Sequence, residues 1–127
     1  MRHRALIVED DPNTQKLLAA ILAGEGFDVA LADDGDIAID LLKDGPFAVI
    51  LLDIVLQRVS GTAVMEYLRE KNPAMLERVI VVTGLDVNEI RALFPSVKLA
   101  LSKPVMPARL RASVRDCLPG SNAGAVA

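Results

Sequence analysis

Ionisable and hydroxyl residues follow four short apolar segments of this chain, at the point where each segment ends. These are Glu9, Asp10 and Asp11 after ALIV, Asp53 after FAVILL, Thr83 after VIVV, and Lys103 after LALS. Parallel strands end at one edge of a sheet, and ligands bind in the crevice outside those ends. We therefore expect these side chains to meet, although they lie about a hundred residues apart.

The acidic members of this group would repel one another. Two unit charges about 4 Å apart interact by roughly 4 kcal/mol at an effective dielectric of about 20. A hard divalent cation offsets such repulsion, and Mg²⁺ typically takes one or two carboxylates, several waters and a phosphate oxygen. Asp10 and Asp53 are the expected ligands of Mg²⁺ or Mn²⁺, and Glu9 would assist through a water molecule.

A carboxylate in this position can also attack phosphorus and form an acyl phosphate. Asp53 is best placed for that role, because it ends the most apolar segment, which is typical of a central strand. The metal and Lys103 would stabilise charge on the transferred phosphoryl group. The Thr83 hydroxyl and the Gly84 backbone N–H would donate hydrogen bonds to its oxygens.

The composition favours a single α/β domain. The chain has 127 residues, of which 52% are hydrophobic and 3% aromatic, so aliphatic side chains must build the core. The net charge of -3 provides no basic surface for direct binding to nucleic acid or to an anionic membrane. The sequence shows neither a membrane span nor a secretion signal, so we expect a cytoplasmic location.

Strands and helices are expected to alternate five times. The expected strands are 5–8, 27–31, 47–52, 79–82 and 98–102. Asp11, Asp34 and Asp86 have the position of helix N-caps. The helical spacing also places Leu17 and Leu93 on buried faces. Residues 1–118 would form the domain, and the small and polar residues 119–127 a flexible tail.

Four fragments in register resemble one family. VEDDP, LLD followed by Gly61, VVTG and SKP closely resemble the receiver domain of two-component response regulators. The resemblance covers roughly residues 4–118. It implies a flavodoxin-like, doubly wound, five-stranded parallel sheet with strand order 2-1-3-4-5 and five helices.

The resemblance also implies a role for each matching residue of the acidic site. Asp53 would be the phosphoacceptor, and Glu9 and Asp10 would be the acidic pair. The backbone carbonyl of Val55 would be a further ligand of Mg²⁺. The domain would take its phosphoryl group from a histidine kinase or a histidine phosphotransfer protein, and would catalyse only its own phosphorylation and dephosphorylation.

The remaining residues of the motif would act on the phosphoryl group. Thr83 would be the switch hydroxyl, and Lys103 would pair with the phosphoryl oxygens. The bond between Lys103 and Pro104 is expected to be cis. Asp11 lies outside the acidic pair, so its role as a helix cap is preferred.

The sequence departs from the family at four positions. Ala100 stands where the family usually carries Tyr or Phe, so we expect the switch to act mainly through the loop after Thr83 and the helix that follows. Gln57 replaces a common proline in the loop after Asp53. Val55 and Leu85 are apolar where they would flank the site, so an attacking water would find few partners and self-dephosphorylation should be slow.

Several alternatives stay open. A degenerate receiver acting as a constitutive protein-interaction scaffold is one, and Ala100 is its main support. The arginines of the last helix, among them Arg109 and Arg111, form either a solvated face or a partner-docking surface. The output is expected to be read by a separate target protein, unless the chain is a piece of a larger regulator or hybrid kinase.

Overall fold

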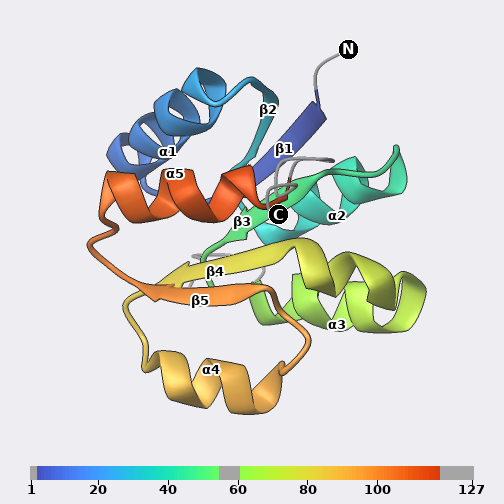
Figure 1. The fold of residues 1–127 in the computed structure, drawn as a ribbon. Coiled ribbons are helices and arrows are strands. Elements are labelled where there is room, and N and C mark those ends of the chain that lie inside the picture. Colours follow the sequence, from blue (N-terminus) through green and yellow to red (C-terminus); the bar gives the residue numbers. More distant parts are fainter. Residues whose placement is uncertain (1–2, 55–60, 118–127) are drawn as a thin grey trace, which may run out of the picture.

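The computed structural model describes residues 3–54 and 61–117, which form a five-stranded parallel sheet between helices (Figure 1). The strands are β1 (His3–Val8), β2 (Phe27–Ala32), β3 (Val49–Leu52), β4 (Val79–Thr83) and β5 (Leu99–Ser102). Their order in the sheet is β2-β1-β3-β4-β5, and every neighbouring pair is parallel. The flavodoxin-like order implied by the resemblance is therefore confirmed.

Six helices lie in the described part of the chain. They are α1 (Pro12–Gly24), α2 (Gly35–Lys43), α3 (Gly61–Lys71), the 3₁₀ helix η1 (Pro73–Arg78), α4 (Val87–Leu93) and α5 (Pro107–Arg115). The five expected helices are present, whereas η1 was not predicted. Pro73 opens η1, because its fixed φ suits the first position of a helical turn. None of these helices combines the length and the apolar character that a bilayer crossing would need.

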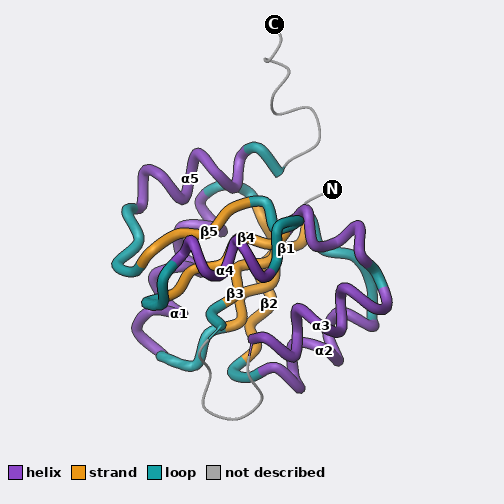
Figure 2. Tube along the Cα trace, turned by 90° about the horizontal axis from the view of Figure 1, so that it is seen from below, coloured by secondary structure: helices purple, strands orange, loops and turns teal. Residues whose placement is uncertain are grey.

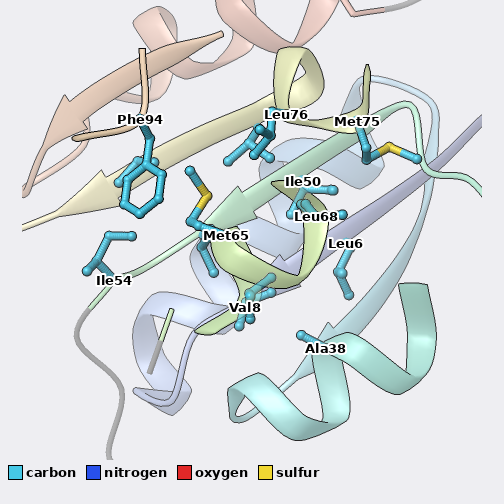
Figure 3. Packing of buried hydrophobic residues seen from close by; sticks show 14 of the residues in the cluster. Leu6, Val8, Ala38, Ile50, Ile54, Met65, Leu68, Met75, Leu76 and Phe94 are labelled. Atoms are coloured by element: carbon cyan, nitrogen blue, oxygen red, sulfur yellow. The ribbon is translucent and has the colours of Figure 1, made fainter. Parts of the chain in front are cut away.

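Successive residues of the central strands pack against opposite faces of the sheet. Leu6 and Val8 of β1 belong to a cluster with α2, α3 and α4, whereas Ala5 and Ile7 belong to a cluster with α1 and α5. All four residues of β3 are buried. Figure 3 shows Met65 and Leu68 of α3 above the first of these faces. Covering the sheet on both sides makes β3 continuously apolar, as expected for a central parallel strand.

Strand β3 is shorter than the sequence indicates. It begins at Val49, although Phe47 was expected to open it. Phe47 is buried but makes other contacts: its carbonyl oxygen accepts a hydrogen bond from Arg78 Nη1 at 3.0 Å, and the Arg4 guanidinium lies 4.3 Å from its ring centroid. Side-chain partners therefore take the place of strand pairing at this residue.

The caps of α1, α2 and α4 were predicted correctly, but some of the apolar positions were not. Asp11, Asp34 and Asp86 each accept a hydrogen bond from a backbone N–H two or three residues later, at 2.8 to 3.0 Å. Leu17 and Leu93 are 49% and 64% exposed, so their expected burial is wrong. In α1 and α4 the apolar face is therefore wider than the part of the helix that contacts the sheet.

Gly61 sets the distance between α3 and the end of β3. A Cβ at Gly61 would lie 2.3 Å from the Asp53 carbonyl oxygen and 2.7 Å from Ile54 Cα. The Gly61 N–H donates to the Ile54 carbonyl at 3.0 Å. Only glycine allows this backbone approach, which holds Asp53 against the first turn of α3.

We expect Gly61→Ala to destabilise the fold by roughly 1–3 kcal/mol, because backbone must move to admit the methyl group. Gly24→Ala is the matched control, since a Cβ at the end of α1 meets no atom within 4 Å. Urea unfolding of both variants measures the difference. Equal stability of the Gly61 variant and the wild type would show that the close approach is not required.

Candidate functional site

Backbone hydrogen bonds align the site residues at the carboxyl edge of the sheet. The Glu9 amide donates to the carbonyl of the last residue of β2 at 3.1 Å, and the Asp53 amide donates to that of the last residue of β1 at 3.0 Å. The Lys103 amide donates to the carbonyl of the last residue of β4 at 2.9 Å. Each residue thus continues its strand by one ladder bond beyond the regular sheet. The strand ends place the three side chains within reach of one another, as the sequence predicts.

Three carboxylates converge at this edge. Glu9, Asp10 and Asp53 each offer one oxygen, and these oxygens lie within 4.8 Å of one another. Glu9 and Asp53 are 1% and 6% exposed, whereas Asp10 is partly open to solvent. Negative charges so close together and so poorly hydrated require a compensating cation.

Lys103 supplies one such charge. Its Nζ donates to Asp53 Oδ2 at 2.8 Å and to Glu9 Oε1 at 2.9 Å. Partial burial acts to lower the pKa of Lys103, but the hydrogen bonds to Asp53 and Glu9 outweigh it and raise this pKa above its usual value. The ammonium therefore stays charged at neutral pH, and one lysine holds the ends of β1 and β3 together.

The side chain and the backbone carbonyl of Glu9 both accept hydrogen bonds, which the sequence did not reveal. Its Oε2 accepts from the Asp11 N–H at 3.0 Å, while its backbone carbonyl accepts from Gln15 Nε2 at 3.0 Å. The same amide nitrogen donates to Asp33 Oδ1 at 3.0 Å. Gln15 thereby ties the turn after β1 to the loop after β2. A lone glutamine on a helix carries no sequence signal for this role.

The hydroxyl and glycine expected at the end of β4 lie at the same edge. Thr83 is fully buried, and its Oγ1 accepts from the Leu85 N–H at 3.2 Å. Gly84 is exposed, and a Cβ there would meet no atom within 4 Å. Open space therefore lies beside the threonine, as expected for access of an anion. The Lys103–Pro104 bond is cis, as the resemblance implies.

Asp11 caps α1 and is not part of the acidic group. Its Oδ2 accepts from Thr14 N and Thr14 Oγ1 at 2.8 and 2.7 Å. The hydrogen bonds from Thr14 lower the pKa of Asp11. Val55 and Gln57 lie outside the described residues, so the expected backbone ligand and the expected loop substitution stay predictions.

The donor set fits a hard divalent cation. Carboxylate oxygens are the protein ligands that Mg²⁺ prefers, and the partly open position of Asp10 leaves room for waters and for a phosphate oxygen. A carboxylate, an ammonium and a potential metal site at one point form the set of groups that phosphoryl transfer to an aspartate needs.

Comparison with known proteins supports this chemical interpretation of the site. Residues 5–115 match the family described as response regulator receiver domain. The DNA-binding response regulator MtrA of Mycolicibacterium smegmatis is 32% identical over 115 residues, which are 91% of this chain and 50% of MtrA. The chain thus spans about half the length of the relatives it matches.

Two solved structures resemble the chain over nearly its whole length. A CheY-like receiver domain protein from Methanospirillum hungatei has a TM-score of 0.82 and 27% identity, covering 98% of this chain and 99% of that one. The response regulator TrrA of Thermotoga maritima, solved in complex with Mg²⁺–BeF, has a TM-score of 0.80 and 25% identity, covering 91% and 99%. The chain belongs to the receiver domain family of response regulators.

Proposed function

We propose that Asp53 is the phosphoacceptor of this receiver domain. The observation that carries the proposal is the contact of Asp53 with Lys103, made inside a group of three converging carboxylates. Receiver domains partner with histidine kinases, so the proposed donor is the phosphohistidine of a histidine kinase or of a phosphotransfer protein. The domain acts as a signalling module whose chemistry is confined to its own aspartate.

The transfer is a displacement at phosphorus. A carboxylate oxygen of Asp53 forms the new P–O bond with its own electron pair, while the P–N bond to the donor histidine breaks and its electron pair returns to the imidazole nitrogen. Lys103 already contacts Asp53 at 2.8 Å, so its ammonium stands where charge on the phosphoryl oxygens must be stabilised. Thr83 Oγ1 and the Gly84 N–H are proposed as further donors to those oxygens.

The proposed metal ligands are Asp10, Asp53 and the backbone carbonyl of Val55, with Glu9 acting through water. When bound, Mg²⁺ supplies positive charge that neutralises the carboxylates and the incoming phosphoryl group. The complex of TrrA with Mg²⁺–BeF supports this assignment by family likeness. Mn²⁺ has similar ligand preferences and is proposed as a substitute.

The proposed output is a change in partner binding through the segment after Thr83. Leu85 N–H bonds to Thr83 Oγ1, and Asp86 caps α4, so any movement of the hydroxyl toward a phosphoryl group breaks or shifts the contact that leads into α4. A separate target protein, or a further domain of a longer regulator, is proposed to recognise this conformational change. The three carboxylates, the threonine and the lysine are all in place, which disfavours the constitutive scaffold.

We expect one phosphate to add to the protein when it is incubated with acetyl phosphate and Mg²⁺, as measured by intact mass. Asp53→Asn should abolish the added mass, because a neutral amide lacks the nucleophilic carboxylate. Asp40→Asn on the exposed face of α2 is the matched control and should be phosphorylated normally. A folded wild-type protein that gains no mass would contradict the proposal.

We expect Asp10→Asn to stabilise the metal-free fold by roughly 0.5–1.5 kcal/mol, because it removes one of three crowded charges. The same change should remove most of the stabilisation that added Mg²⁺ gives to the wild type. Thermal unfolding with and without Mg²⁺ measures both effects. Marked destabilisation of the metal-free variant would mean that Asp10 is chiefly a structural residue.

We expect Leu85→Glu to hasten loss of the phosphate by at least about threefold, because a polar group there can orient an attacking water. Leu85 is 45% exposed, so the substitution should be tolerated. Leu93→Glu, at a still more exposed leucine of α4, is the matched control and should leave the lifetime unchanged. Decay followed by mass spectrometry measures the rates, and equal lifetimes in all three proteins would refute the expectation.

A further inference from the structure

The side-chain amide of Gln15 lies between two loops that border the acidic site. Its Nε2 donates to the Glu9 carbonyl and to Asp33 Oδ1, each at 3.0 Å. Glu9 directly follows β1 and Asp33 directly follows β2, while Gln15 belongs to α1, which packs against β2. A carbonyl and an ionised carboxylate carry no hydrogen, so only the nitrogen of the amide can face them, and both of its N–H groups are used. The orientation of the Gln15 amide is thereby fixed.

The hydrogen bond to Glu9 fixes the peptide unit that leads into Asp10. The Glu9 carbonyl and the Asp10 N–H belong to one planar unit, so holding the carbonyl holds the whole plane. The next unit, between Asp10 and Asp11, is held from its other end, because the Asp11 N–H donates to Glu9 Oε2 at 3.0 Å. The backbone on both sides of Asp10 is therefore fixed, and Asp10 is the most open carboxylate of the acidic group.

This restraint bears on metal binding because the three carboxylates repel one another. Asp10 lies at the solvent side, so an unrestrained backbone would let it turn away from Glu9 and Asp53. A ligand residue that must first be ordered loses conformational entropy when the metal binds, and the affinity for the metal falls accordingly. Residues that hold a metal ligand from outside typically change metal affinity by about 10–100-fold.

We propose that Gln15 is a positioning residue for the metal site and that Asp33 anchors it. Gln15 acts through the Glu9 carbonyl, which sets the direction of Asp10, while Asp33 holds the amide from the loop after β2. The inference rests on the proposed function for the identity of the cation, Mg²⁺. The alternative is a purely structural link between α1 and β2, which would change the stability of the metal-free protein without changing its affinity for Mg²⁺.

Three pairs of proteins separate these roles. Gln15→Met keeps the length of the side chain but removes both donors, and it is compared with the wild type. Asn13→Met is its matched control, because Asn13 is an exposed amide residue of the same helix. Asp33→Ala and Asp33→Asn remove the same charge, but only asparagine keeps an oxygen that can accept from Gln15.

Thermal unfolding over a series of Mg²⁺ concentrations measures the affinity, because a ligand of the folded state raises the melting temperature according to its concentration relative to Kd. We expect Gln15→Met and Asp33→Ala to weaken Mg²⁺ binding by about tenfold. Asp33→Asn should stay within about threefold of the wild type, and Asn13→Met should match it. Phosphorylation of Gln15→Met by acetyl phosphate should approach the wild-type rate at saturating Mg²⁺.

A second measurement needs no metal. Exchange of the Asp11 amide hydrogen, followed by NMR in the metal-free protein, should be faster in Gln15→Met than in Asn13→Met, because Glu9 is less firmly held. Circular dichroism checks that the variants fold. If Gln15→Met does not fold, the two Asp33 variants test the inference by themselves.

Equal affinity for Mg²⁺ in Gln15→Met and the wild type would overturn the inference, as would a lower melting temperature with no change in that affinity. Equal weakening by Asp33→Asn and Asp33→Ala would assign the effect to the charge of Asp33 and overturn its role as an anchor. A wild type whose Mg²⁺ affinity depends on Gln15 but which takes no phosphate refutes the proposed phosphoacceptor alone. A phosphorylated wild type whose Mg²⁺ affinity Gln15→Met equals refutes this inference alone.

Discussion

The shared ion pair of Lys103 with Asp53 and Glu9 is the interaction on which the site depends. Three carboxylates within 4.8 Å of one another would separate if nothing neutralised them, and two of them are almost fully buried. The ammonium contacts those two and leaves Asp10 at the solvent side. One positive charge cannot balance three negative ones, so the site retains an excess of negative charge that favours a divalent cation. The same ammonium is then available to an anion.

The rest of the fold holds these groups in register. The ladder bonds that align Glu9, Asp53 and Lys103 require a sheet with order β2-β1-β3-β4-β5, and that sheet is stable only because helices cover both of its faces. Figure 2, viewed at right angles to Figure 1, shows these helices surrounding the strands. Gly61 adds a close approach of α3 to the Asp53 backbone that no other residue permits. The packing of the core therefore also fixes the geometry of the site.

Signalling requires a segment of the domain that can move. The segment from Thr83 to α4 fits that need, because α4 has only seven residues and is attached to the core mainly through Ile90 and Phe94. The same short helix packs beside β5, with Val87 and Arg91 lining a groove next to that strand. A small displacement beside Thr83 would therefore be transmitted through α4 to a surface that lies away from the three carboxylates.

The sequence by itself determined the fold class, the five strands, the helix caps and the members of the acidic group. Strand periodicity, Asp at the start of α1, α2 and α4, and polar residues at strand ends are local signals that tertiary packing did not override. Only the tertiary structure decided that Gln15 holds Glu9, that Phe47 is bonded to Arg78 instead of to a strand, and that Leu17 and Leu93 are exposed. Each of these depends on contacts between segments distant in the chain, and such contacts leave no periodic pattern in the residues that make them.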